Sequence, residues 1–146
     1  MILISACLAG KNYKYNGTNN ECQWVVDFIK ANKDKCILVC PELEIFSVPR
    51  PPVEIIDGKA INKDGKDVTA GFTEGALREW EKAKRVANGQ KIERAILKAN
   101  SPSCGCDTIY DGTFSGKVVA GDGFFTQLLK EKGIKVITEK ETMQSW

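Results

Sequence analysis

The 146-residue sequence contains no histidine. This absence removes the commonest general base and the commonest zinc ligand together, so any bound metal must be held by sulfur or oxygen atoms. It also argues against an activated nucleophilic cysteine, because such a cysteine is commonly activated by a neighbouring histidine. Several familiar types of active site are therefore excluded before any motif is considered.

The chain also lacks an excess of charge and a long apolar run. Its 21 basic and 19 acidic residues give a formal net charge of +2, and the basic residues are scattered along the sequence. This balance provides no electrostatic surface for nucleic acid or membrane, so we expect neither partner. No apolar run approaches the length of a membrane-spanning helix.

Several sequence motifs are missing as well. No Cys-x-x-Cys pair is present, which argues against thioredoxin chemistry and zinc ribbons. No glycine-rich stretch ends in Gly-Lys-Ser/Thr, and the stretch GDGFFT (121–126) lacks the third glycine of a dinucleotide-binding loop. Common nucleotide-binding loops are therefore not expected.

Cysteine, by contrast, is abundant, with six copies in the chain. The stretch MILISACLAGKN (1–12) has no basic segment, and its apolar run is too short for a secretory signal. We therefore expect a cytoplasmic protein, whose thiols stay reduced. In that compartment, clustered cysteines are more often metal ligands or catalysts than disulfides.

Hydrophobic patterning predicts alternating strands and helices. Strands are expected at residues 2–5, 36–39, 94–99 and 134–138. Helices are expected after a cap at Asn19 or Asn20, over residues 71–89 with Gly89 at the end, and from a cap at Asp122 to Gly133. The alternation implies a parallel sheet.

Glycine-rich segments separate these elements. The pairs Asp57-Gly58 and Asp64-Gly65 predict an excursion with a hairpin, and residues 110–123 are expected to form turns. The sequence thus predicts an α/β protein with a single domain over residues 1–146. Its expected fold is three-layered and Rossmann-like, with a mostly parallel sheet of about four strands plus a hairpin excursion.

Three cysteines follow the ends of predicted strands. Cys7 lies just past the first strand, Cys40 just past the second, and Cys104 a few residues past the third. Parallel strands end at the same edge of a sheet, and ligands bind at that edge in open α/β folds. We therefore expect these three thiols to meet.

The other three cysteines are interpreted differently. Cys36 begins the strand that Cys40 follows, about 13 Å away at 3.3 Å per residue, so we assign it to the core. Cys22 lies near a helix start that faces the same edge, and the favoured interpretation is an ordinary helix residue. Cys106 could be a fourth ligand, a resolving thiol or a bystander, and we favour the last.

Six segments occur in an order that resembles a known family. They are SACLAGKNYKYNG, CPE with PRPPVEI after it, KANSPSCG, IYDGTFSGKVVAGDG and GIKVITE. Together they resemble the small thiouracil desulfidase family, long described as a domain of unknown function. The resemblance runs from Ser5 to Glu139, and the combination is specific although each piece alone is weak.

The resemblance implies a cofactor, a reaction and a set of site residues. In the family, three cysteines hold a [4Fe-4S] cluster and leave one iron without a protein ligand; here they fall on Cys7, Cys40 and Cys104. The free iron would take the sulfur of a thiolated pyrimidine without net redox change. Glu42 and Ser101 would handle water and protons. Exposure to air can remove such a cluster.

The residue types agree with this chemistry. Thiolates are the usual ligands of iron–sulfur clusters. Glu42 follows Cys40 by two residues, so in an extended chain it points to the same side and can serve as a base. Ser101 and Ser103 precede Cys104 and offer hydroxyls to a proton relay or to the substrate. Arg50 could anchor an anionic or carbonyl-bearing ring.

The sequence departs from the family pattern in two places. Lys14 and Asn16 stand where Arg and Asp are common, and Glu44 to Phe46 replace a Gly-Gly. We expect these positions to lie where a substrate is held, so the identity of the thiolated base is left open.

Two other functions are compatible with the sequence. One is a zinc- or cluster-binding module with a structural or sensing role, in which Cys22 or Cys106 completes a closed site of four cysteines. The other is a sulfur-handling protein acting on thiolated RNA bases, against which the near-neutral charge counts. The sequence makes no prediction of oligomeric state.

Overall fold

The computed structural model of the chain describes residues 1–141. The strands are β1 (Ile2–Ser5), β2 (Cys36–Val39), β3 (Val53–Ile56), β4 (Lys59–Asn62), β5 (Arg94–Leu97), β6 (Thr108–Tyr110), β7 (Val118–Ala120) and β8 (Lys135–Thr138). The α-helices are α1 (Gln23–Ala31), α2 (Thr69–Ala87) and α3 (Phe124–Glu131), and the 3-10 turns are η1 (Ala6–Ala9), η2 (Lys33–Lys35) and η3 (Pro41–Glu44).

The main sheet has four strands in the order β2-β1-β5-β8, and all of its neighbouring strands are parallel. In the shared register, Ile4 of β1 lies beside Leu38 on one side and Ile96 on the other. These are the four strands expected from the sequence, so the predicted parallel sheet is confirmed.

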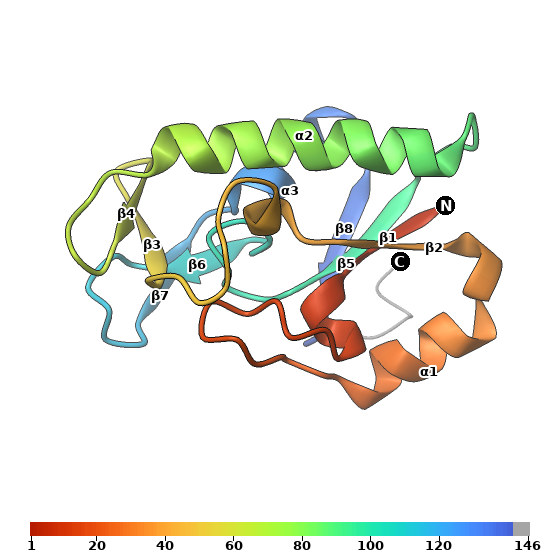
Figure 1. Cartoon of the computed structure of the whole chain (residues 1–146), viewed down its shortest axis with the longest axis horizontal. Coiled ribbons are helices and arrows are strands. Elements are labelled where there is room, and N and C mark those ends of the chain that lie inside the picture. The colour runs from red at the N-terminus through yellow and green to blue at the C-terminus, as the bar shows by residue number, and fades with distance from the viewer. Residues whose placement is uncertain (142–146) are drawn as a thin grey trace.

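Helices cover both faces of this sheet. Helices α2 and α3 pack on one face and α1 on the other (Figure 1). Because strand side chains alternate, Leu3 packs with Phe125 of α3 in one core cluster, whereas Ile4 packs with Val25 of α1 in the second. The three-layer fold is therefore confirmed. Across residues 1–141, none of the helices combines the length and apolar character needed to cross a membrane.

Two antiparallel hairpins extend from the sheet. Strands β3 and β4 turn at Asp57 (φ 50°) and Gly58 (φ 76°), so the predicted hairpin is confirmed. The stretch 110–123, expected to form turns only, contains β7, which pairs with β6. Its three β7 residues are all exposed, which explains why no buried pattern marked this strand.

The predicted helix caps are wrong at two starts. Helix α1 begins after Cys22 rather than after Asn19 or Asn20, since the Asn19 carboxamide already accepts a bond from the Glu21 N–H. Helix α3 begins after Gly123 instead of Asp122. The Asp122 carboxylate instead accepts a hydrogen bond from the Asp107 N–H at 2.7 Å.

The helix ends are closer to expectation. Helix α2 ends at Ala87; Asn88 is its cap residue with φ 49°, and the predicted Gly89 follows with φ +88°. Gly133 follows α3 with φ +76°, as predicted for the residue after a helix end.

Candidate functional site

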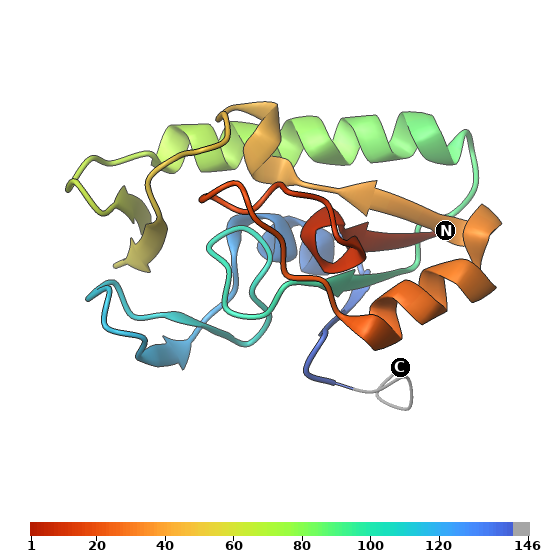
Figure 2. The same ribbon diagram turned by 60° about the horizontal axis from the view of Figure 1, so that its bottom comes forward.

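Cys7, Cys40 and Cys104 line one cavity of about 450 Å³. Cys7 lies in η1 after β1, Cys40 directly precedes η3 after β2, and Cys104 lies in the turn after β5. Figure 2 shows the segments that follow β1 (red) and β5 (teal) side by side at the end of the sheet that faces the hairpins. The fold thus brings three thiols together from separate parts of the chain.

These three thiols are poorly solvated. Cys104 is 6% exposed, and its sulfur is hydrogen-bonded by the Ser5 side chain. The Asn20 side chain bonds the Cys7 sulfur in the same way. Burial raises the pKa of all three thiols, to about 11 for Cys40. The thiolate form therefore needs a cationic partner, which a bound metal supplies while displacing the proton.

The spacing of the sulfurs favours a ligand larger than one ion. Within residues 1–141, Cys106, Asp107 and Asp122 place their ligand atoms within 4.8 Å of one another. The sulfurs of the three cavity cysteines are not gathered as closely. A single zinc ion with bonds of about 2.3 Å would hold its sulfurs about 3.8 Å apart. An iron–sulfur cluster binds each thiolate through a different iron, so wider spacing fits it better.

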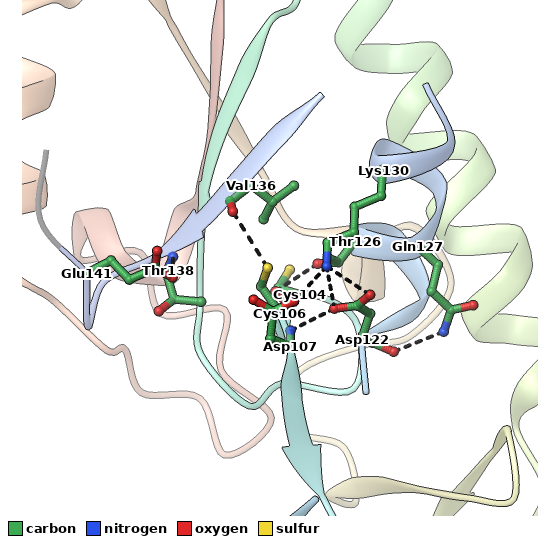
Figure 3. A network of polar contacts seen from close by, with 10 residues as sticks. All are labelled: Cys104, Cys106, Asp107, Asp122, Thr126, Gln127, Lys130, Val136, Thr138 and Glu141. Atoms are coloured by element: carbon green, nitrogen blue, oxygen red, sulfur yellow. Dashed lines mark hydrogen bonds and ion pairs between the residues drawn. The ribbon is translucent and has the colours of Figure 1, made fainter. Parts of the chain in front are cut away.

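The Cys106 group already contains a cation. The Lys130 ammonium lies 2.8 Å from the Asp107 carboxylate and 3.0 Å from that of Asp122 (Figure 3). The Cys106 thiol donates to the Val136 carbonyl at 3.6 Å and packs in the core. The ion pairs of this cluster connect α3 to the turn before β6.

The remaining thiols do not line the cavity. Cys22 and Cys36 pack against the core cluster on the α1 side of the sheet, and Cys106 lies in the cluster on the other side. All six cysteines are free. Within the described residues, therefore, no fourth cysteine completes a closed site at the cavity.

Glu42 lies in the cavity wall and is held from two sides. Arg50 Nε donates to Glu42 Oε1 at 3.1 Å, and the Ser103 hydroxyl donates to Glu42 Oε2 at 2.9 Å. Arg50 also donates to the Tyr13 carbonyl at 2.9 Å. The Glu42 and Arg50 side chains are only 16% and 9% exposed. The structure thus joins three of the predicted site residues in one network.

The two serines differ in position. Ser101 lines the cavity, and its Oγ accepts hydrogen bonds from the N–H groups of Ser103 at 3.1 Å and Cys104 at 3.0 Å. Ser103 is 2% exposed and does not line the cavity. Ser101 therefore shapes the turn that carries Cys104, and Ser103 contacts Glu42 rather than the open space.

Two charged residues that sequence reasoning missed support this edge of the sheet. Glu79 on α2 is 3% exposed and accepts a hydrogen bond from the Cys40 N–H at 3.3 Å. Burial, followed by repulsion from Glu44, raises the pKa of Glu79. Lys98 lines the cavity and pairs with Glu139 at 2.7 Å. Glu79 follows Ala76 by three residues on the buried helix stripe, a signal that could have identified it.

The departures from the family pattern lie differently from our expectation. Lys14 lines the cavity, but Asn16 does not. Glu44 pairs with Lys82 of α2 at 3.3 Å, and the Phe46 ring packs 5.5 Å from that of Phe72. Neither Glu44 nor Phe46 lines the cavity, so these two side chains contact α2 instead of the cavity.

Comparison with known proteins places these features in context. A family model described as 2-thiouracil desulfurase matches residues 2–141. The uncharacterized protein YbbK of Bacillus subtilis (strain 168) is 40% identical over 152 residues, covering 97% of each chain. The solved structure of a [4Fe-4S]-dependent thiouracil desulfidase, TudS, is 37% identical, covers 98% of this chain and 93% of its own, and superposes with a TM-score of 0.83.

Proposed function

The chain belongs to the 2-thiouracil desulfurase family, and from this membership we propose that it removes sulfur from a small thiolated pyrimidine. Water adds its oxygen to the thiocarbonyl carbon, the carbon–sulfur bond breaks, and the products are the oxo-pyrimidine and sulfide, with no net electron transfer. The observation that carries this proposal is the convergence of Cys7, Cys40 and Cys104 on one cavity.

The cavity cysteines fit an iron–sulfur cluster. They supply thiolates only, their sulfurs do not all lie within 4.8 Å of one another, and no histidine competes with them. Cys7, Cys40 and Cys104 would hold the [4Fe-4S] cluster, which supplies an iron Lewis acid with affinity for a soft sulfur atom.

Glu42 would accept the proton of the attacking water. Its carboxylate lies in the cavity wall, and Arg50 and Ser103 fix both of its oxygens. This assigns Arg50 and Ser103 to positioning the base rather than to binding the ring. A positioned general base typically contributes 10²- to 10⁴-fold to the rate.

Ser101 would hold a proton close to the departing sulfur. Its Oγ accepts two backbone hydrogen bonds, which leaves the hydroxyl proton as its one donor. Because Ser101 lines the cavity beside Cys104, that proton is available to a group bound there.

The closed four-cysteine module receives no support from the positions of Cys22 and Cys106, which lie outside the cavity wall. We propose that the protein works in the cytoplasm, because all six cysteines are free and thiols stay reduced in that compartment. We also propose a small-molecule partner rather than RNA, since the net charge of +2 is scattered.

One experiment tests the activity directly. Protein purified without oxygen should be brown, contain about four irons and four sulfides per chain as one [4Fe-4S] cluster requires, and convert 2-thiouracil to uracil and sulfide. Several thiolated pyrimidines should be assayed in parallel, because Lys14 changes the cavity wall. Colourless protein that contains zinc and resists iron reconstitution would contradict the proposal.

A further inference from the structure

The turn between β6 and β7, residues 111–117, carries an aromatic residue in a strained conformation. Phe114 has φ +56°, in the left-handed region that bulky side chains rarely adopt. Such strain persists only where the surroundings enforce it, and it gathers at functional sites. Phe114 belongs to neither core cluster, so burial in the core does not explain why a phenylalanine stands there.

Contacts from β3 hold this turn in place. Oε1 of Glu54 accepts hydrogen bonds from the N–H groups of Gly112 and Phe114, each at 3.0 Å. Gly112 has φ +92°, and a Cβ there would lie 2.2 Å from Cγ1 of Ile56, so the turn is seated directly on the strand. The Asp111 N–H closes the turn by donating to the Lys117 carbonyl at 2.9 Å.

Phe114, held in this way, is one of the residues that line the same cavity as Glu42 and the three cysteines. A phenyl ring offers a flat apolar face and no hydrogen bond, which suits a planar heteroaromatic ring and leaves its polar edges to other groups. A glycine would relieve the strain but would remove that face. The aromatic ring is thus what a phenylalanine offers at this position that a glycine cannot.

We propose that Phe114 is a specificity-determining residue that stacks on the pyrimidine ring of the substrate, and that Glu54 is its positioning residue. This inference rests on the proposed function for the identity of the ring. It adds a binding surface contributed by the hairpin, on elements that carry none of the three cavity cysteines.

The first test replaces Phe114 by Gly, Leu and Tyr in cluster-loaded protein. The Kd of uracil, measured by calorimetry, and the KM for 2-thiouracil should both rise by about 10- to 100-fold in Phe114→Gly and Phe114→Leu. This is the range expected for the loss of aromatic–base stacking. Phe114→Tyr should stay within about threefold of wild type, since it keeps the aromatic face. Iron content should not change, and kcat should fall less than the ratio kcat/KM.

Thermal unfolding separates stacking from a structural role. Phe114→Gly should have a Tm no lower than that of the wild type, because glycine relaxes the positive φ. Val119→Ala provides the matched control, since Val119 is exposed on the same hairpin and does not line the cavity. It should keep both binding and KM.

The second test addresses Glu54. Glu54→Ala should raise KM, because the N–H groups of Gly112 and Phe114 lose their acceptor, whereas Glu54→Gln keeps an acceptor oxygen and should restore KM to within about threefold. Equal effects of Ala and Gln would instead assign the carboxylate charge to direct substrate contact and overturn the positioning role.

Failure of the inference differs from failure of the proposed function. Wild-type turnover of 2-thiouracil with an unchanged KM in Phe114→Gly and Phe114→Leu would overturn the stacking role alone. Uracil binding that weakens in Phe114→Gly, with no desulfurisation by the loaded wild type, would support the stacking role and reject the activity. Absence of both binding and turnover in the wild type would overturn both.

Discussion

Three thiols at the ends of three different strands are expected to act as one ligand set. Replacing Cys7, Cys40 or Cys104 by serine should each abolish iron retention, because a hydroxyl is a poor substitute for a thiolate ligand. Iron and sulfide analysis after anaerobic reconstitution measures this. Retention of a full cluster by any one of the three variants would remove that cysteine from the set.

The other cysteines provide controls for this prediction. Cys36→Ser and Cys106→Ser should keep the cluster, because neither residue lines the cavity. Cys106→Ser is expected to lower the free energy of unfolding by about 1–3 kcal/mol through an added polar group in the core. Iron loss in Cys106→Ser would point to a closed site of four ligands.

Glu42 carries the prediction about chemistry. Glu42→Gln should retain iron and bind the substrate but lose about 10²- to 10⁴-fold in kcat, because an amide cannot accept the proton from water. Steady-state assays of sulfide release measure the loss. Glu44→Gln is the matched control, since this neighbouring carboxylate pairs with Lys82 and does not line the cavity. Wild-type turnover by Glu42→Gln would place the base elsewhere.

At the scale of elements, the close contact of α2 with η3 sets the position of Cys40 and Glu42. A Cβ at Gly75 would lie 2.5 Å from the Pro41 carbonyl oxygen. Gly75→Ala should therefore destabilise the protein by about 1–2 kcal/mol, since overpacking outweighs the gain in helix propensity. It should also lower kcat more than Leu77→Ala.

Leu77 is a suitable comparison because it lies on the same helix and is 48% exposed. Leu77→Ala should change the free energy of unfolding by no more than about 0.5 kcal/mol and leave kcat unchanged. Denaturant unfolding and sulfide-release assays on the two variants measure these effects. A Gly75→Ala protein with wild-type stability and kcat would show that the contact can relax without moving η3.

At the scale of the whole molecule, iron loading should stabilise the fold. The three cysteines follow β1, β2 and β5, which are neighbours in one sheet, so a group bound to all three links their ends. A ligand at about 1,000 times its Kd adds about 4 kcal/mol, which corresponds to a rise in Tm on the order of 10 °C for a chain of this size. Thermal unfolding of loaded and chelator-treated protein measures the difference.

The variant Cys40→Ser is the control for this effect, and its Tm should not respond to iron. Equal Tm values for loaded and iron-free wild type would contradict a link between the strand ends.

The single-domain organisation over residues 1–146 stays a prediction.

Much of the fold followed from the sequence because it depends on local patterns. Four apolar runs of strand length, separated by helical periodicity, predicted the parallel sheet, and Asp57-Gly58 predicted the β3–β4 turn. Parallel strands share one carboxyl edge, so the placement of Cys7, Cys40 and Cys104 along the chain predicted their meeting. The helix starts were missed because Asn19 and Asp122 bond to other partners.

The amino-acid sequence by itself thus determined the layer architecture and the three converging thiols, since both follow from periodicity and strand direction. Only the tertiary structure decided which side chains support them. The contact of Ser103 with Glu42 joins residues 61 apart, and that of Glu54 with Phe114 joins residues 60 apart. Such pairs depend on how loops and hairpins pack across the cavity, which no local pattern specifies. The same packing places Glu44 and Phe46 against α2 and outside the cavity wall.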